Sequence, residues 1–289
     1  MINGNLNLAI QRKGRLSDKS LELLKLCSIE IENYAERLAI SAKNFPINVL
    51  FLRDDDIPEY VRDGVADLGI VGEDVIAEKK IELNVVEKLG FGNCKLMIAY
   101  PENHPIVKLE DLNGKRIATS YKNILKNFLI ENNIKASIVE LSGSVEIAPS
   151  LGVADCICDI VSTGTTLMMN KLKPSFSIFE SQAVLIANEN TTKDEKKMSI
   201  IAELQKRIRS ILAAKNSKYL MMNIPKSSLE QIIKVLPALK SPTILNLADP
   251  DMLAVHVVIP TDKFWSMIDD LKKYGASGIL LLPIENMII

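Results

Sequence analysis

A run of small polar residues separates two apolar segments near the middle of the chain. The strand-like stretch Cys156–Val161 ends at Ser162, Thr163, Gly164, Thr165 and Thr166, and an apolar run resumes at Leu167. A tight turn would need only about two such residues. Backbone N–H groups and the dipole at the start of a following helix attract anions, and the hydroxyl groups add donors. The pattern therefore favours a phosphate site, although not a Walker A loop, because no lysine follows the glycine.

Asp159 lies in the predicted strand just before this loop. A carboxylate would repel a phosphate, so we expect Asp159 to bind sugar hydroxyls or Mg²⁺ instead. A phosphate site beside a site for ribose hydroxyls would together bind a 5-phosphoribosyl group. The alternative is an ordinary polar turn that caps a helix.

A second set of polar residues follows other predicted strands. Lys13, Gly14 and Arg15 follow the strand Leu6–Ile10, Arg53 follows the strand Ile47–Leu52, and Asp74 follows a third strand that carries Gly69 and Gly72. Carboxyl ends of parallel strands form one edge of a sheet, where ligands of open α/β sheets bind. We expect these residues to share that edge and to face the phosphate loop. The alternative is that they only solvate loops.

Short apolar strands alternate with amphipathic helices through most of the chain. This alternation predicts parallel, doubly wound α/β sheets. A second unit begins near Lys95, and the apolar segment 175–188 is long enough to return from it to the first unit. We expect two α/β lobes joined by two crossing strands, with a cleft between them, as in bilobal ligand-binding proteins of the periplasmic type.

The last part of the sequence has a different pattern. A charged helix over residues 191–215 is expected to act as a connector whose basic residues face solvent. The βαββαβ order that follows it predicts a ferredoxin-like domain with one helix-free sheet face. Ser227–Glu230 has the pattern of a capping box, and Thr261 is expected to cap the second helix.

Composition, charge and hydrophobicity argue against a nucleic-acid-binding, a membrane or a secreted protein. The chain has 289 residues and a net charge of −1, which gives no general attraction for nucleic acid or an anionic membrane. No apolar run approaches the ~20 residues that span a bilayer, and no secretion signal opens the sequence, so we expect a cytoplasmic protein. The few, irregularly spaced cysteines are expected to be buried free thiols; they are Cys27, Cys94, Cys156 and Cys158.

These segments resemble ATP phosphoribosyltransferase of the long form, the first enzyme of histidine biosynthesis. The resemblance rests on AIQRKGRLSDKSLELLK, LRDDDIPEYVRDGVADLGIVGEDV, SGSVEIAPSLGVADCICDIVSTGTTL and the tail from KYLMMNIP to GASGILLLPIE, in order along the chain. It implies two catalytic lobes, residues 1–94 with a return segment at 184–212, and residues 95–183. It also implies a regulatory domain at 215–289 that binds histidine, a requirement for Mg²⁺, and homo-oligomers in hexamer and dimer forms.

The resemblance also implies which residues bind each ligand. Those implied for phosphoribosyl pyrophosphate are Glu146, Asp159, Ser162, Thr163, Gly164, Thr165 and Thr166, with Mg²⁺ held through Asp159. Those implied for ATP and pyrophosphate are Lys13, Gly14, Arg15, Arg53, Asp67 and Asp74. Those implied for the effector histidine are Asn223, Thr243, Val258 and Gly278. Some relatives carry Asp at the position of Asn223. The neutral Asn can still hydrogen-bond the amino group of the ligand, but it lacks the negative charge of Asp.

In the reaction implied by the resemblance, N1 of adenine attacks C1 of the ribose and pyrophosphate leaves. N1 already has a lone pair, so no strong base is needed and no acid–base residue is assigned. Positioning of two substrates, with cations on the pyrophosphate, can supply most of the rate enhancement. The alternatives are a non-catalytic bilobal binding protein and an amino-acid sensor.

Overall fold

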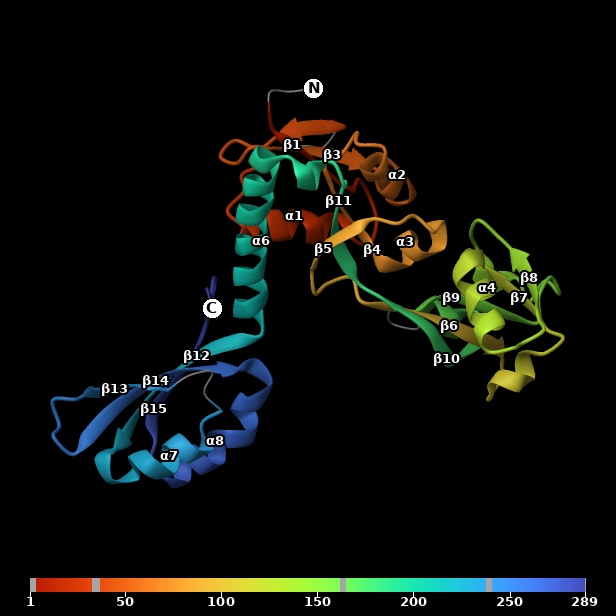
Figure 1. Ribbon diagram of the computed structural model, residues 1–289. Coiled ribbons are helices and arrows are strands. Elements are labelled where there is room, and N and C mark those ends of the chain that lie inside the picture. The colour runs from red at the N-terminus through yellow and green to blue at the C-terminus, as the bar shows by residue number, and fades with distance from the viewer. Residues whose placement is uncertain (1–3, 33–36, 162–164, 238–240, 289) are drawn as a thin grey trace. The chain divides into compact units, whose positions relative to one another are not determined.

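The computed structural model describes residues 4–32, 37–161, 165–237 and 241–288 (Figure 1). Internal contacts divide the chain into two units, Met1–Ala202 and Glu203–Ile289. Among the described residues the first unit carries two sheets and the second unit carries one. No helix within these ranges is long and apolar enough to cross a membrane.

The first sheet has the strand order β2-β3-β1-β4-β11-β5. Its strands are β1 (Leu6–Gln11), β2 (Ala39–Ser41), β3 (Ile47–Leu52), β4 (Leu68–Gly72), β5 (Asn84–Lys88) and β11 (Ala183–Ala187). Helices α1 (Ser17–Leu26), α2 (Ile57–Arg62) and α3 (Glu73–Lys79) follow β1, β3 and β4. Because β3, β1 and β4 run parallel, the loops that follow them lie at one edge of the sheet.

The second sheet has the order β10-β6-β9-β7-β8. Its strands are β6 (Cys94–Pro101), β7 (Arg116–Thr119), β8 (Ser137–Glu140), β9 (Cys156–Val161) and β10 (Leu172–Ser181), and its helices are α4 (Lys122–Glu131) and α5 (Thr165–Met169). β9, β7 and β8 are parallel. The four cysteines are buried and free, as expected.

Both sheets are mixed rather than wholly parallel. β10 leaves the second sheet and β11, which follows it directly, enters the first, as expected for a returning segment. β11 pairs antiparallel with β4 and β5, and β6 pairs antiparallel with β9 and β10. The antiparallel pairs arise because the connecting strands run against the direction of the doubly wound strands.

The second unit has the expected ferredoxin-like order. Its elements are β12 (Ser217–Pro225), α7 (Leu229–Val235), β13 (Thr243–Asn246), β14 (Met252–Pro260), α8 (Phe264–Lys273) and β15 (Ser277–Pro283), with the strands in the order β13-β14-β12-β15. Every second residue of β12 and β14 is buried in a core shared with α7 and α8, for example Leu220 and Val255. The residues between them, such as Asn223 and Val258, therefore point to the opposite, helix-free face.

The helix starts in this unit differ from the sequence prediction. The predicted capping box is not formed: Ser227 lies inside the 3₁₀ turn Lys226–Ser228, and Ser228, which precedes α7, makes no side-chain capping bond. Thr261 opens a 3₁₀ turn, Thr261–Lys263, and α8 begins only at Phe264. In both places a 3₁₀ turn runs directly into the helix, so the chain enters it through backbone turns rather than side-chain caps.

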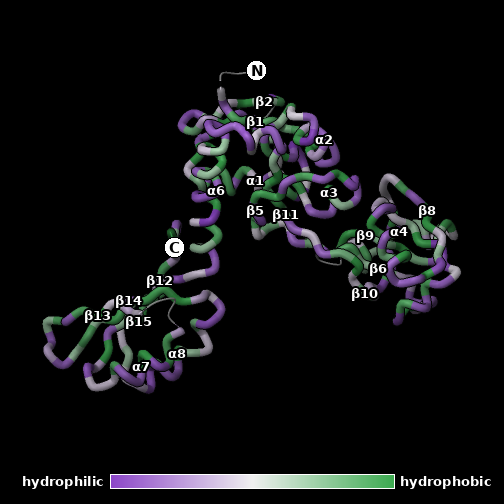
Figure 2. The backbone as a smooth tube through the Cα atoms, viewed as in Figure 1, coloured by the Kyte–Doolittle hydropathy of each residue, from purple (hydrophilic) through white to green (hydrophobic). Residues whose placement is uncertain are grey.

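Helix α6 (Glu195–Lys215) belongs partly to each unit. Hydrophobic and hydrophilic residues alternate along it (Figure 2). Its buried residues include Ile201, Leu204, Ile208 and Ile211, a spacing that places them on one side of the helix. The expected charged connector is therefore amphipathic.

Candidate functional site

The carboxyl edge of the first sheet brings together charged residues from three strands. Arg15 follows β1, Asp54 follows β3, and Asp74 lies in the first turn of α3 after β4. Arg53 also follows β3 and is exposed, and Lys13 and Gly14 lie exposed in the loop before Arg15. The sequence thus correctly predicted that Arg15 and Asp74 share an edge.

Asp74 is the most enclosed of these groups. Its side chain is 2% exposed, and Nη2 of Arg15 lies 3.4 Å from both carboxylate oxygens. The hydroxyl of Ser181 donates to Oδ1 of Asp74, and the backbone N–H of Asp74 donates to Oγ of Ser181 over 3.0 Å. Nη1 of Arg15 donates to the carbonyl of Gly92 over 3.0 Å. Arg15 is therefore fixed by two partners in this conformation.

Gly72 makes this packing possible. A Cβ atom at this position would collide with Oδ1 of Asp74 and would lie 3.3 Å from Nη2 of Arg15. The absence of a side chain at Gly72 therefore lets the buried carboxylate fold back over the end of β4.

Asp54 is a member of this cluster that the sequence reasoning missed. Within the described part of the chain, its Oδ1 atom is buried and has no hydrogen-bond partner. Burial raises the pKa of Asp54 from 3.8 to about 6, and the negative charge of Asp74 adds to the increase. Asp54 is one of three consecutive aspartates, and only the packing distinguishes it from Asp55, which is exposed.

Asp159 on β9 is the corresponding acidic residue of the second sheet. The backbone N–H of Ile160 donates to its Oδ1 over 2.8 Å. Burial raises the pKa of Asp159, and the charge of Glu146 raises it further. Glu146 lies in the 3₁₀ turn Val145–Ile147. The structure therefore places Asp159 and Glu146 close enough to interact, as oxygen acceptors for a cation or for sugar hydroxyls.

The hydroxyl of Tyr121, just before α4, interacts electrostatically with acidic residues of both sheets. Burial raises the pKa of its hydroxyl, and the charges of Asp74 and Asp159 both raise it further. These two carboxylates belong to different sheets, so the hydroxyl is within electrostatic range of acidic residues of both. Sequence reasoning missed Tyr121, because a tyrosine at a helix start carries no signal of its own.

Only the end of the predicted phosphate loop lies within the described residues. Ser162, Thr163 and Gly164 lie outside the described residues. Thr165 and Thr166 are exposed in the first turn of α5, which follows β9 as the sequence predicted.

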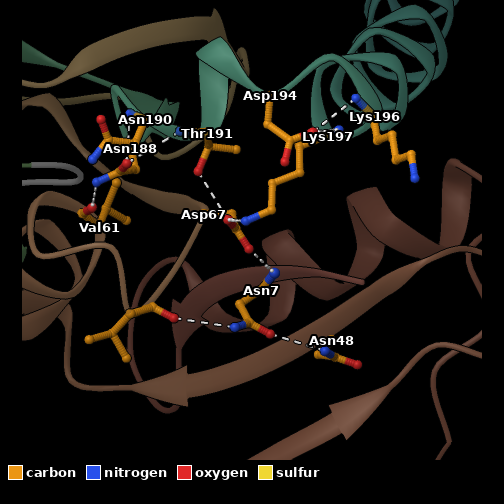
Figure 3. Close-up of polar contacts among 11 residues, drawn as sticks. Asn7, Asn48, Val61, Asp67, Asn188, Asn190, Thr191, Asp194, Lys196 and Lys197 are labelled. Atoms are coloured by element: carbon orange, nitrogen blue, oxygen red, sulfur yellow. Dashed lines mark hydrogen bonds and ion pairs between the residues drawn. The ribbon is translucent and has the colours of Figure 1, made fainter. Parts of the chain in front are cut away.

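Asp67 lies apart from the other predicted ATP residues. It precedes β4, whereas Asp74 follows it, so the two lie at opposite edges of the first sheet. Its carboxylate accepts hydrogen bonds from the backbone N–H of Asn7 (2.7 Å), Oγ1 of Thr191 (3.0 Å) and Nζ of Lys197 (2.6 Å) (Figure 3). These contacts attach the start of α6 to the sheet.

Glu78 links helix α3 of the first sheet to helix α4 of the second. Its carboxylate accepts hydrogen bonds from the backbone N–H groups of Asn123 (2.9 Å) and Ile124 (3.0 Å). Nδ2 of Asn123 donates to the backbone carbonyl of Glu78 over 2.8 Å. Glu78 therefore caps a helix that begins one residue after Tyr121.

The predicted effector residues all lie on strands of the second unit. Asn223 lies beside Gly278, where an added Cβ would be 3.4 Å from Nδ2 of Asn223. Thr243 is opposite His256, and Val258 is opposite Tyr219, whose hydroxyl lies 2.8 Å from Nδ1 of His256.

The four predicted effector positions are spread along the strands of the sheet. The partner of Asn223 on β14 is Ala254, four residues from Val258, which is roughly 13 Å along a strand. A single small ligand on one copy of the sheet therefore does not reach all four residues.

The described residues contain no group of three or more His, Cys, Asp or Glu side chains arranged to hold a metal ion. Mg²⁺ is commonly held by one or two carboxylates together with substrate phosphates. The neighbouring carboxylates of Asp159 and Glu146 fit that kind of site.

Comparisons with known proteins indicate the same family along almost the whole chain. A family model described as ATP phosphoribosyltransferase matches residues 53–210, and one described as HisG, C-terminal domain, matches residues 214–286. The chain is 49% identical over 283 residues to ATP phosphoribosyltransferase of Cytophaga hutchinsonii, covering 98% of each chain. It is 48% identical over 284 residues to the enzyme of the same name from Bacteroides thetaiotaomicron, covering 98% of this chain and 100% of that one.

A solved structure agrees with the fold as well. The ATP phosphoribosyl transferase (HisG:HisZ) complex from Thermotoga maritima contains a chain with 32% identity and a TM-score of 0.60, covering 71% of this chain and 98% of that chain.

Proposed function

Because the chain belongs to the ATP phosphoribosyltransferase family, we propose that its two groups of acidic and basic residues hold the two substrates of that enzyme. The protein is a pentosyltransferase: it transfers the 5-phosphoribosyl group of phosphoribosyl pyrophosphate to N1 of ATP. The products are phosphoribosyl-ATP and pyrophosphate, and the reaction is the first step of histidine biosynthesis.

Phosphoribosyl pyrophosphate binds on the second sheet in this proposal. Asp159 and Glu146 accept hydrogen bonds from the ribose hydroxyls, and the loop that leads into Thr165 and Thr166 holds the 5-phosphate. The observation that carries this assignment is the position of Asp159 on β9, directly before a hydroxyl-rich loop and within electrostatic range of Glu146. We assign Ser162, Thr163 and Gly164 to the same phosphate site from their sequence alone.

Mg²⁺ would be held by Asp159, with Glu146 beside it and substrate oxygens completing its ligands. When bound there, the ion would supply positive charge that offsets the charge of the leaving pyrophosphate. The protein residues orient the ribose so that C1 faces the first sheet.

ATP binds at the carboxyl edge of the first sheet in this proposal. Asp74 and Arg15 form the enclosed part of that edge, and Lys13, Gly14 and Arg53 lie exposed beside it, where phosphate groups can reach them. We leave Asp67 out of this site, because its carboxylate is engaged at the opposite edge of the sheet.

The chemistry needs no strong base, because the lone pair of N1 attacks C1 directly. The protein holds the two substrates in line and keeps the charged groups in place before the reaction begins. The fixed Arg15–Asp74 pair and the cap of Glu78 on α4 are contacts of the kind that provide such positioning.

For the second unit we propose feedback inhibition by histidine, bound on the helix-free face of its sheet near Asn223 and Gly278. Val258 lies too far along the sheet from Asn223 to contact the same molecule in one copy, so we infer that neighbouring copies share the site. This inference favours homo-oligomers, in dimer and hexamer forms. We also propose a cytoplasmic location, since four buried free thiols suit a reducing compartment.

The test is to incubate the purified protein with ATP, phosphoribosyl pyrophosphate and Mg²⁺ and to follow formation of the adenine adduct by absorbance. Product should require all three components. Asp159→Asn should raise the KM for phosphoribosyl pyrophosphate about tenfold or more and leave the Tm within a few degrees. Tight binding of both substrates without any product would contradict the proposal and favour a non-catalytic bilobal binding protein.

A further inference from the structure

The proposed ATP site contains a carboxylate oxygen that lacks a donor. Oδ1 of Asp54 is buried at the end of β3, next to the Arg15–Asp74 pair, and has no partner within the described part of the chain. Buried polar atoms in folded proteins are almost always hydrogen-bonded, so such an atom at a binding site indicates a ligand that brings the partner.

The charge of the cluster limits what that partner can be. Arg15 is already shared between Asp74 and the carbonyl of Gly92, and within the described ranges Asp54 forms no ion pair. The cluster contains one arginine and two carboxylates, which gives it a net negative charge. A phosphate group would be repelled here, whereas a group with N–H or O–H donors would be attracted.

The reaction determines which part of ATP reaches this point. N1 of adenine must approach C1 of the ribose held near Asp159, so the N1 edge of the purine has to lie between the two acidic groups. The charges of both Asp74 and Asp159 act on the hydroxyl of Tyr121, so the two acidic groups are within electrostatic range of one side chain. The triphosphate then extends away from the cluster. The donor on the N1 edge of adenine is the 6-amino group, which is attached to the carbon next to N1.

We propose that Asp54 accepts a hydrogen bond from the 6-amino group of ATP and thereby directs N1 toward the phosphoribosyl group. This assignment rests on the proposed function. When N1 forms its new bond, the purine gains positive charge that is shared with the 6-amino group. The carboxylate of Asp54 then faces a stronger donor, so its contact with the substrate strengthens as the bond to C1 forms.

The experiment compares two ligands on the full-length protein by calorimetry. One ligand is ATP, and the other is purine riboside 5′-triphosphate, which has hydrogen in place of the amino group. Asp54→Ala should weaken ATP binding by about tenfold or more, because a hydrogen bond to a charged acceptor is lost. The same variant should bind the purine riboside triphosphate as the unchanged protein does.

Two further variants separate binding from folding. Asp54→Asn keeps the shape and a neutral acceptor, so it should recover part of the ATP affinity that Asp54→Ala loses. Asp55→Ala is the matched control, because Asp55 is exposed in the same 3₁₀ turn, and its ATP affinity should be unchanged.

Three results would overturn the proposal. They are equal losses for both ligands, an unchanged ATP affinity in Asp54→Ala, and a loss for ATP that disappears with 2′-deoxy-ATP, which would assign the donor to the sugar. If the unchanged protein forms product and Asp54→Ala binds ATP normally, the proposed function stands and only the role of Asp54 fails.

Binding at different pH gives an independent readout. Asp54 is surrounded by Asp74 and Asp55, which favour its protonation, and by Arg15, which opposes it. ATP affinity of the unchanged protein should fall as the pH decreases through about 6, relative to the purine riboside triphosphate, which has the same titrating phosphates. In Asp54→Asn the ratio of the two affinities should not change over that range.

Discussion

At the residue scale, the ATP half of the proposed site contains a group that opposes folding. Burial makes ionised Asp54 unfavourable, which is why its pKa is raised to about 6. Charging this residue above its pKa therefore costs stability in the folded protein. A binding site can retain such a group when a ligand compensates for it.

We expect Asp54→Asn to be more stable than the unchanged protein at pH 8. An unfolded chain releases the proton of Asp54 near 3.8 and the folded chain releases it near 6, so the unchanged protein loses stability as pH rises between these values. The loss corresponds to at most about 3 kcal/mol, and it is absent in the variant. Thermal unfolding at pH 4 and pH 8 measures the difference between the two proteins. A variant that is less stable at pH 8 would show that Asp54 has a structural partner.

Asp67 should act in stability rather than in ATP binding. Asp67→Ala removes the acceptor for Lys197, Thr191 and the backbone of Asn7, and it should lower the free energy of unfolding by about 2–4 kcal/mol. The KM for ATP should stay within about twofold at a temperature where the variant is folded. A tenfold rise in that KM with an unchanged Tm would instead place Asp67 in the substrate site.

At the element scale, the positions of the proposed site residues depend on how helix α4 is held. Its first turn receives the carboxylate of Glu78 from α3, and Tyr121 immediately precedes it. A negative group near a helix N-terminus satisfies unpaired N–H groups and interacts well with the helix dipole. The same contact links helices that pack on two different sheets.

Glu78→Ala should therefore affect stability and catalysis together. Loss of the cap should cost about 1–2 kcal/mol, and the KM values of both substrates should rise because Glu78 no longer holds the start of α4, and with it Tyr121, to helix α3. Glu82→Ala is the matched control, because Glu82 is exposed shortly after α3, and it should change neither quantity. Thermal unfolding and initial rates provide the two measurements. Unchanged KM values in a destabilised Glu78→Ala would confine Glu78 to a capping role.

At the scale of the whole molecule, the proposed catalytic and regulatory parts lie in two compact units, and helix α6 belongs partly to each. The site residues from Arg15 to Asp159 lie in the first unit, and the strands with Asn223 and Gly278 lie in the second. The second unit has its own core between its sheet and helices α7 and α8. A ligand that binds there changes the rate only by favouring one arrangement of the protein over another.

Ending the chain after Lys215 should abolish inhibition by histidine and preserve binding of phosphoribosyl pyrophosphate. The truncation removes the strands of the second unit and the contacts of Ser210 with Asn286 and Met287, while the first unit keeps both of its sheets. Turnover should fall if oligomer contacts are lost. Calorimetry and rates with added histidine, on full-length and truncated protein, measure the change. Histidine binding that survives truncation would place the effector in the catalytic unit as a competitor.

The sequence by itself determined the order of elements and which strand ends carry the charged residues of the proposed site. Hydrophobic runs of strand length and glycine-containing turns depend on local backbone geometry, so they located β1, β3 and β9 to within a residue or two. Since parallel strands end at a common edge, Arg15 and Asp74 could be placed together before any contact was known. The resemblance to a family added the roles of residues, which local patterns do not contain.

Only the tertiary structure decided which charges are paired and which are left without a partner. Asp67 and Asp74 look alike in sequence, but they lie at opposite ends of β4, and one of them is bound by Lys197. Asp54 differs from its neighbour Asp55 only because the packing around Arg15 and Asp74 buries one of its oxygens. Burial and pairing depend on groups far apart in the chain, so a pattern of adjacent residues cannot predict them.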